Sequence, residues 1–275
     1  MKLWAAPGTM LVRISVILLI AVAAVPMWRK AALAYALPKT GFTPSVDARV
    51  LIQNGSSAQQ LAALVNKHLP AAIDQVQKIQ GYSLDKPLKI YVFDNEADYM
   101  RLGACPLGSR ACVFASQMSI APVLLREPDT VLPLLTHELS HVLLQQRMGT
   151  WKISRVPPWF LEGLAVMVSD GGGSEGVGPQ DAAQAIKAGQ RFTPEMGKSL
   201  LSQKTAQHYQ LPHRLFYRQS ALFVQHLKTA HSDSFDSLMR RMHAGMGFHD
   251  AFERSFPQPI DILWAEFLKT QGATP

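Results

Sequence analysis

The sequence predicts an α+β fold, in which a small mixed sheet is followed by a mainly helical half with a histidine-bearing helix at the junction. Short β-type runs occur only before residue 128, whereas apolar residues recur at helical spacing from Asp129 onward. Hydrophobic residues make up 48% of the 275 residues and charged ones 17%, which allows a sizeable core. We therefore expect one domain over residues 37–275, with a sheet-containing part at about 50–128 and a helical part at about 129–275.

The sheet-containing part begins with a predicted helix over residues 56–80, in which Pro70 predicts a kink or a break. The run PLKIYVF, 87–93, is typical of a short strand. Asp94 directly after it could cap a following helix. Two more strands are expected at about 111–116 and 118–125.

The helical part is interrupted by one stretch, SDGGGSEGVGPQ at 169–180, whose glycines predict a flexible low-complexity loop. The periodic segments on either side of it are predicted helices at 129–148, 157–169, 180–189, 213–230, 232–243, 247–254 and 259–270.

The N-terminal residues 1–36 resemble an export segment. Lys2 and Arg13 precede an uncharged run of 15 residues, 14–28. That length is short for a spanning helix of about 20 residues but suits the core of a signal peptide. Small residues two apart, at 21–23 and 34–36, offer cleavage sites.

An uncleaved signal anchor is the alternative, because Arg29 and Lys30 follow the apolar run and residues 10–28 could then contact the membrane. Both alternatives export the body of the protein. We expect it in the periplasm, free or anchored to the inner membrane and facing the periplasm, or secreted.

The net charge of +7 does not predict nucleic-acid binding. Residues 1–36 carry four basic residues and no acid, so the body has a net charge of only +3 and no dense Lys/Arg run.

Cys105 and Cys112 are the two cysteines of the chain, and a Pro/Gly/Ser loop separates them. In an exported protein such a pair predicts a disulfide. A metal clip is the alternative, but it normally needs four ligands and the chain has no second cysteine pair.

The stretch LLTHELSHVLLQQ, 134–146, contains His137 and His141 four residues apart on the same face of the predicted helix. Both rings can therefore bind one metal ion. Glu138 is rotated by about 100° from His137, beside the ion, where it could accept a proton from metal-activated water. The alternative is an ordinary buried helix that carries two imidazoles.

A third ligand separates these alternatives, because catalytic zinc usually has three protein ligands and one open position. Position 147 is Arg, so a third histidine six residues after His141 is excluded. Glu162 is the candidate instead, since it stands within an apolar helix that Pro157 and Pro158 begin. An exposed helix face would also explain an acid there, but the neighbouring residues leave little polar face.

THELSHVLL (136–144) followed by PPWFLEGLAV (157–166) resembles the peptidase MA-like group of gluzincin zinc metallopeptidases, whose site layout is similar to that of thermolysin. The similarity covers about residues 130–170. It implies a zincin-like fold and one Zn²⁺ per chain on His137, His141 and Glu162, with Glu138 as general base. It also implies that a strand of the sheet borders the substrate cleft.

The chain departs from this pattern at Val166, where many such proteins have an acid four residues after the ligand glutamate. A ligand histidine usually donates its second N–H to a carboxylate or carbonyl. We therefore expect a backbone carbonyl, Asp170 or another residue in that role.

Relatives in this group often carry a tyrosine in a later helix, and Tyr217 in the segment 213–227 could stabilise an oxyanion. A core tyrosine is the alternative. The remaining histidines show no ligand spacing with the motif and are expected to be surface or satisfied core residues: His208, His213, His226, His231, His243 and His249.

Together these features predict an exported zinc metallopeptidase that hydrolyses peptide bonds with zinc-activated water, an endopeptidase rather than an exopeptidase. The expected partner is a peptide or protein substrate. The alternative is a catalytically weak or inactive pseudo-peptidase that binds proteins or peptides in the cell envelope. Intact Glu138 favours the enzyme, because a scaffold has no need of that acid.

Overall fold

The computed structural model of the chain describes residues 37, 39–103, 105–106, 108–114, 116–197 and 203–274. The predicted export segment, residues 1–36, lies outside the described residues. Within the described part, no helix has both the length and the apolar character needed to cross a membrane.

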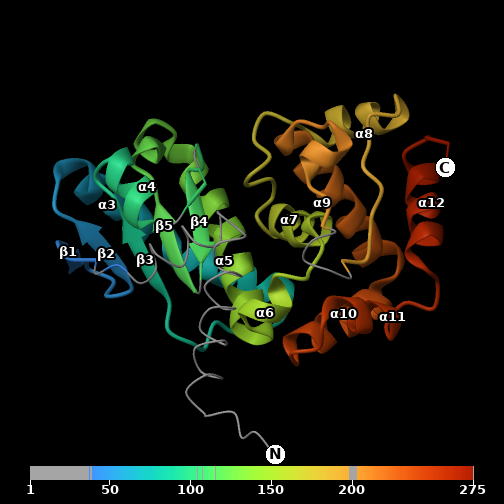
Figure 1. The fold of residues 1–275 in the computed structure, drawn as a ribbon, viewed down its shortest axis with the longest axis horizontal. Helices are drawn as coiled ribbons and strands as arrows, with labels where there is room; N and C mark the ends of the chain where they lie inside the picture. Colours follow the sequence, from blue (N-terminus) through green and yellow to red (C-terminus); the bar gives the residue numbers. More distant parts are fainter. Residues whose placement is uncertain are drawn as a thin grey trace, which may run out of the picture.

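A five-stranded mixed sheet forms one side of the molecule (Figure 1). Its order is β1 (Phe42–Pro44), β2 (Val50–Gln53), β3 (Lys89–Val92), β5 (Gln117–Ile120) and β4 (Ala111–Phe114). The three inner strands are parallel, and the outer strands β1 and β4 are antiparallel to their neighbours. The α+β class with a small mixed sheet is thus confirmed, although β1 and β2 were not predicted.

The helices follow the order α3 (Ser56–Gln80), α4 (Glu96–Leu102), α5 (Val131–Met148), α6 (Thr150–Ile153), α7 (Pro158–Val168), α8 (Pro179–Lys187), α9 (His213–Ala230), α10 (Ser232–His243), α11 (Phe248–Glu253) and α12 (Ile260–Thr270). Short 3₁₀ helices span Pro122–Arg126, Pro128–Thr130 and Ala206–Tyr209. The helical half is confirmed to within two residues at each predicted end, but α6 and the 3₁₀ helices were not predicted. The strand predicted at 118–125 ends early, because a 3₁₀ helix begins at Pro122.

Two local predictions in the sheet half need correction. Of the kink or break predicted at Pro70, the break is wrong, because helix α3 continues through this residue. Pro70 is exposed, so water can solvate the carbonyl that the proline leaves unbonded. Asp94 does not cap α4; its Oδ1 accepts a hydrogen bond from the backbone N–H of Ala58 in the first turn of α3, at 3.0 Å. Asn95 caps α4 instead, by accepting from the N–H of Asp98.

Alternate residues of β3 point to the two faces of the sheet. Ile90 and Val92 belong to the main core with α3 and α5, whereas Tyr91 and Phe93 pack in a smaller cluster with α4 on the opposite face. Helix α5 packs against α3 and β4 and also against α7 of the helical half. It therefore stands at the junction of the two halves, as predicted (Figure 1).

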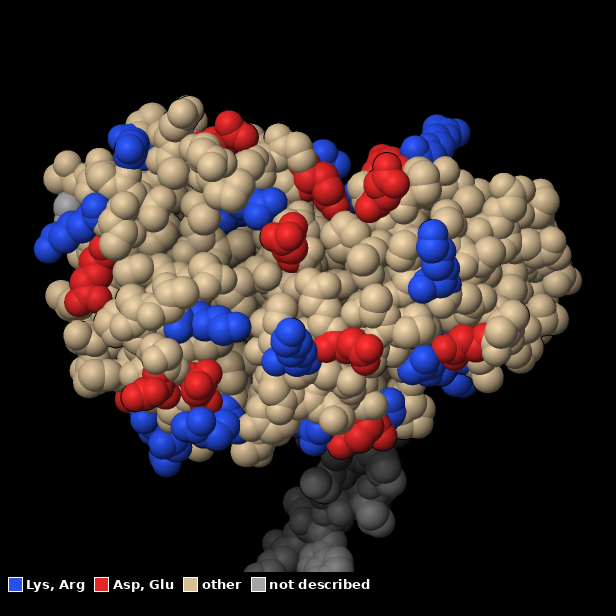
Figure 2. All heavy atoms as spheres, turned by 180° about the vertical axis from the view of Figure 1, so that it is seen from behind, with Lys and Arg blue, Asp and Glu red and all other residues tan. Residues whose placement is uncertain are grey.

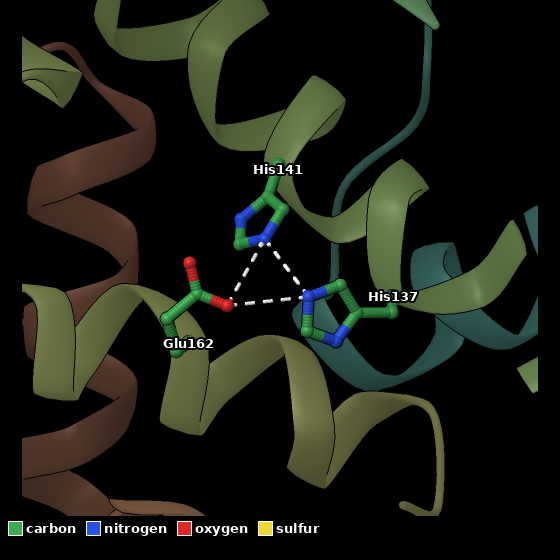
Figure 3. Close-up of side chains that lie close together, drawn as sticks. All are labelled: His137, His141 and Glu162. Atoms are coloured by element: carbon green, nitrogen blue, oxygen red, sulfur yellow. Dashed lines mark hydrogen bonds and ion pairs between the residues drawn. The ribbon is translucent and has the colours of Figure 1, made fainter. Parts of the chain in front are cut away.

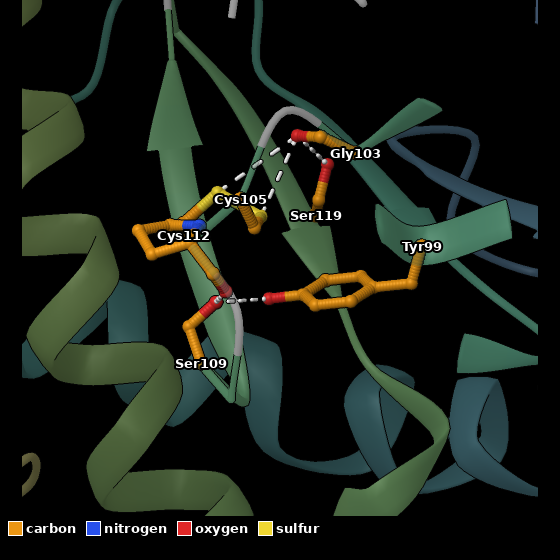
Figure 4. The surroundings of a disulfide bond; sticks show 7 residues. Tyr99, Gly103, Cys105, Ser109, Cys112 and Ser119 are labelled. Atoms are coloured by element: carbon orange, nitrogen blue, oxygen red, sulfur yellow. Dashed lines mark hydrogen bonds between the residues drawn. A yellow bond between two sulfur atoms is a disulfide. The ribbon is translucent and has the colours of Figure 1, made fainter. Parts of the chain in front are cut away.

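The predicted disulfide between Cys105 and Cys112 is present, with Cα atoms 5.6 Å apart, so the metal-clip alternative is wrong. Cys112 lies in the edge strand β4. The carbonyl of Gly103 accepts a hydrogen bond from the Ser119 hydroxyl at 3.1 Å next to the bridge (Figure 4). The disulfide and this hydrogen bond together fasten the connection that leads into β4 to the neighbouring strand β5.

Charged side chains of both signs are interspersed on the face of the molecule shown in Figure 2. The ion pairs include Arg110–Glu127 at 2.8 Å and Arg147–Asp85 at 3.1 Å. Such exposed pairs typically contribute at most about 1 kcal/mol each, so the fold depends on its apolar core.

Helices α7 and α9 approach each other closely at Gly163. A Cβ atom there would lie 2.6 Å from the backbone oxygen of Ser220. We expect Gly163→Ala to lower the free energy of unfolding by about 1–3 kcal/mol or more, although alanine is the better helix former, because two backbones would have to separate.

Urea unfolding of Gly163→Ala and of the control Gly247→Ala measures this effect. A Cβ at Gly247 meets no atom within 4 Å, so the control should change stability by less than about 1 kcal/mol. Equal effects of the two substitutions would contradict the close packing of α7 on α9.

Candidate metal centre

Three side chains from two helices converge on one point (Figure 3). His137 and His141 come from α5, and their Nε2 atoms are 3.1 Å apart. Glu162 comes from α7, with its Oε2 atom 3.3 Å from His137 Nε2 and 3.6 Å from His141 Nε2. The structure thus brings together the three residues that the sequence predicts as ligands.

These spacings suit a zinc ion. Tetrahedral coordination with metal–ligand bonds of about 2.0–2.1 Å places the ligand atoms about 3.3–3.4 Å from one another. Two neutral imidazoles and one carboxylate are also the donors of many catalytic zinc sites. The geometry and the donor set therefore both fit Zn²⁺, with the fourth position left open.

Burial holds the two histidines in place on α5. His137 is 4% exposed, and the flanking leucines Leu135 and Leu139 are buried in the core. Ser140, on the same helix, accepts a hydrogen bond of 2.7 Å from Gln80 of α3. The helix is consequently fixed along its length, and the rings have little freedom to move away from one another.

Glu162 arrives at the centre because the chain reverses direction between the two helices. Gly149 ends α5 with φ of 79°, the short α6 follows, and Pro158 begins α7. Burial opposes ionisation of Glu162, but the two histidines beside it overcome this effect and hold the pKa of the carboxyl far below its usual range. Glu162 is therefore a carboxylate, the form that binds metal.

His137 has a second partner behind the centre. Its Nδ1 lies 2.9 Å from the carbonyl oxygen of Gly172. Since a carbonyl only accepts, Nδ1 carries the proton, and the neutral ring then presents the lone pair of Nε2 to the centre. Burial lowers the pKa of His137, but the neighbouring Glu162 more than offsets that effect and raises it.

The carbonyl of Gly172 takes the role that an acid at position 166, here Val166, has in similar proteins. Val166 has no polar side-chain atom, and Asp170 makes no hydrogen bond to His137 or His141 in the described structure, so neither supplies the outer partner of a ligand histidine. A backbone carbonyl does so for His137, which is one of the predicted alternatives. Among the described residues, the buried Nδ1 of His141 has no hydrogen-bond partner.

The glycine-rich loop that contains Gly172 was predicted to be flexible, but in the structure it is fastened on several sides. Glu175 accepts a hydrogen bond from the N–H of Gly173 and forms an ion pair of 2.6 Å with Arg110, which precedes β4. Arg214 and Arg218 of α9 donate to loop carbonyls. The loop therefore links the sheet half, α9 and the metal centre.

Sequence reasoning missed this role of the loop, although three consecutive glycines are a signal of close backbone approach. A Cβ at Gly172 would lie 2.3 Å from the carbonyl oxygen of Pro133 in α5. A Cβ at Gly173 would lie 2.9 Å from the His137 ring. Both positions must lack a side chain for the loop to reach His137.

Glu138 lies beside the centre and is not one of its three converging ligands. It is 7% exposed and borders a small apolar niche that includes Ala111 of β4 and Met118 and Ile120 of β5. Burial in this niche raises the pKa of the Glu138 carboxyl. A divalent cation at the centre would act in the opposite direction and favour the carboxylate.

Tyr217 on α9 reaches the same centre. Its ring stacks beside that of His137, with centroids 6.3 Å apart. The negative charge of Glu162 and burial raise the pKa of the Tyr217 hydroxyl well above 10, so the hydroxyl keeps its proton and can donate a hydrogen bond. The ring of Tyr217 thus lies beside the centre and also packs against the main core.

The expectation that the remaining histidines are surface or satisfied core residues is wrong for two of them, because buried ring nitrogens of His226 and His243 have no hydrogen-bond partner in the described structure. His226 and His231 come together with Glu266 in a second group of metal-binding type. His243 is a core histidine that stacks on Tyr82 at 3.9 Å, but neither of its ring nitrogens has a hydrogen-bond partner in the described structure. The sequence showed neither arrangement, because both depend on residues that are distant along the chain.

Comparison with known proteins adds no relative to these observations. No protein-family model matches the chain, and neither a curated protein nor a solved structure matches it. The function is therefore inferred from the residues of the centre.

The close approach of Gly173 to His137 is testable. We expect Gly173→Ala to displace the ring and to weaken zinc binding by about 10–100-fold, the usual effect of disturbing an outer partner of a ligand histidine. Zinc affinity would be measured by competition with a chromophoric chelator.

Gly176→Ala is the matched control for this substitution. Gly173 and Gly176 have similar backbone angles, φ of 85° and 80°, so alanine strains both alike. The nearest atom to a Cβ at Gly176, however, is 3.9 Å away. If both variants bind zinc equally well, the loop does not position His137.

Proposed function

We propose that the protein is an exported zinc metallopeptidase of the peptidase MA-like, gluzincin type, with a zincin-like domain, that hydrolyses peptide bonds. The observation that carries this proposal is the spacing of His137, His141 and Glu162, between 3.1 and 3.6 Å, with Glu138 directly beside them. A purely structural zinc site would use a fourth protein ligand. Within the described residues, the group consists of three.

Each residue has a distinct task in this proposal. When bound, zinc supplies the Lewis acidity that activates water and polarises the scissile carbonyl. Glu138 accepts the proton of the attacking water and later passes it to the leaving amine. The Tyr217 hydroxyl donates a hydrogen bond to the oxyanion that forms on the carbonyl.

The position of the edge strand β4 supports the proposal that the substrate is a peptide. It is the last strand in the described sheet order and pairs with β5, and an edge strand is where an extended peptide can add to a sheet. Ala111, at its start, lines the niche that Glu138 borders. A peptide aligned along β4 would therefore pass the proposed general base, which favours an endopeptidase.

Export is supported by the Cys105–Cys112 disulfide, because disulfides persist in oxidising compartments. The apolar run at 14–28 supplies the corresponding signal in the sequence. We propose a location in the periplasm, free or tethered to the inner membrane, or secretion.

Two observations favour the second candidate, a catalytically weak or inactive pseudo-peptidase that binds proteins or peptides. The buried Nδ1 of His141 has no partner in the described structure, and Val166 stands where an acid is expected. A ligand histidine without an outer partner is a poorer base toward the metal. Turnover by the wild-type protein decides between the two candidates.

Glu138→Gln separates the enzyme from the scaffold. The amide is nearly isosteric but does not accept the proton of the attacking water, so we expect the variant to keep its zinc and its fold. Peptide hydrolysis should fall by about 10²–10⁴-fold. Cleavage of a peptide library would be compared at equal zinc occupancy.

Glu162→Ala is the companion variant and should lose the zinc of this centre as well as activity. Equal hydrolysis by wild type and Glu138→Gln would refute the mechanism. A zinc-loaded wild type that cleaves no peptide would favour the binding module, and wild-type zinc content in Glu162→Ala would refute Glu162 as the third ligand.

Tyr217→Phe tests the oxyanion role. Loss of one oxyanion donor typically lowers kcat by about 10²–10³-fold, and we expect unchanged zinc content and a nearly unchanged KM. Tyr209→Phe is the control, because the Tyr209 hydroxyl donates to the backbone of Thr193 at 2.6 Å. A normal kcat in Tyr217→Phe would make Tyr217 a packing residue.

A further inference from the structure

A second group of metal-binding side chains lies in the helical half, apart from the first centre. It consists of His226 in α9, His231 directly after α9, and Glu266 in α12, and one donor atom of each lies within 4.8 Å of the others. His226 follows Tyr217 by nine residues on α9, which separates their backbones by about 13 Å along the helix. The group is therefore distinct from the proposed catalytic centre.

The backbone around this group is well supported. Phe223 of α9 packs on Trp264 and Phe267 of α12, with ring centroids 4.9 and 5.4 Å apart. The ring of His226 lies 5.6 Å from that of Phe267. These contacts fix α12 against α9 (Figure 1) and bring the three donors to the same place.

Two of the three side chains already form a pair. His231 Nε2 and Glu266 Oε2 are 3.0 Å apart. This ion pair gives His226 no partner. The Nε2 atom of His226 is buried and has no hydrogen-bond partner within the described structure. A buried polar atom without a partner destabilises a fold unless something binds it.

We infer that His226, His231 and Glu266 form a second divalent-metal site, suited to Zn²⁺, which ties the C-terminal helix α12 to the end of α9. Two imidazoles and one carboxylate favour zinc and related transition ions, whereas Ca²⁺ and Mg²⁺ prefer oxygen ligands throughout. Water would complete the coordination. The site has one protein ligand fewer than a closed structural zinc site, and it extends the one zinc per chain that the sequence predicts.

The exposure of the ligands indicates how strongly the site binds. The side chains of His231 and Glu266 are 19% and 38% exposed, so they can shift relative to each other and to His226 until the donor atoms stand about 3.3–3.4 Å apart, as tetrahedral zinc requires. The same exposure lets the ion exchange with solvent. We therefore expect weaker binding than at the buried first centre.

The spacing of the two histidines hid this group from sequence reasoning. They are five residues apart, whereas ligands on one helical face are three or four apart. His231 lies beyond the end of α9, where the chain has left the helix with φ of −131°. Only the packing of α12 supplies the third ligand.

Zinc titration of the apo protein, purified without a histidine tag, tests the inference. Wild type should bind two equivalents. His137→Ala/His141→Ala should retain the weaker equivalent, and Glu266→Gln should retain the tighter one. Because the double variant lacks the proposed catalytic centre, this outcome is independent of the proposed function.

His249→Gln is the matched control. His249 forms a similar pair with Glu253, with His249 Nε2 3.4 Å from Glu253 Oε1, but it belongs to neither three-residue group. This variant should keep both equivalents. Glu266→Gln is nearly isosteric and partly exposed, so it should fold, which circular dichroism would check.

Thermal unfolding gives a second measurement. Zinc at about 100 times its Kd should raise the Tm of the His137→Ala/His141→Ala protein by about 5–10 °C, and the further substitution Glu266→Gln should abolish that rise. Absence of zinc binding in the double variant would overturn the inference. Binding of a second zinc equivalent by Glu266→Gln would overturn it too. So would a decrease in the Tm of Glu266→Gln, relative to wild type, that is equally large with and without zinc.

Discussion

The convergence of His137, His141 and Glu162 between two apolar helices, α5 and α7, is the constraint on which the rest of the structure depends. Polar side chains in so apolar a setting are stable only if each has a partner. Here they are partners to one another, and their donor atoms already stand at the distances that a zinc ion requires. The packing of α5, α7 and α9 must hold this geometry, which explains why Gly163 brings two backbones so close together.

The glycine-rich loop extends the same constraint outward. A backbone carbonyl of the loop accepts a hydrogen bond from His137 on the side away from the centre. Glu175 of the loop forms an ion pair with Arg110, next to the edge strand of the sheet. An acid on α7 would be an alternative partner for a ligand histidine, but Val166 is packed in the core. The chain thus uses a main-chain carbonyl where a side chain could serve, and this choice requires a backbone approach that only glycine permits.

The two halves contribute different parts of the proposed chemistry. The helical half supplies the donors, whereas the sheet half supplies the edge strand β4 and an apolar wall beside Glu138. The disulfide and the hydrogen bond between Ser119 and Gly103 fasten the start of that edge strand. Helix α5 belongs to both halves, so a shift of the sheet relative to the helices would move Glu138 relative to the strand edge.

What the sequence by itself determined is local. Residues four apart on a helix share a face, so His137 and His141 were identified from spacing, and a seven-residue separation in a Pro/Gly loop identified the Cys105–Cys112 bridge. Three contacts were decided by tertiary structure alone. Asp94 accepts a hydrogen bond from the first turn of α3, and the carbonyl of Gly172 accepts one from His137. Glu266 lies beside a histidine in α9 and another directly after that helix. The physical reason is that backbone partners have no residue-specific signal, and that contacts between distant segments leave no periodicity in a single sequence.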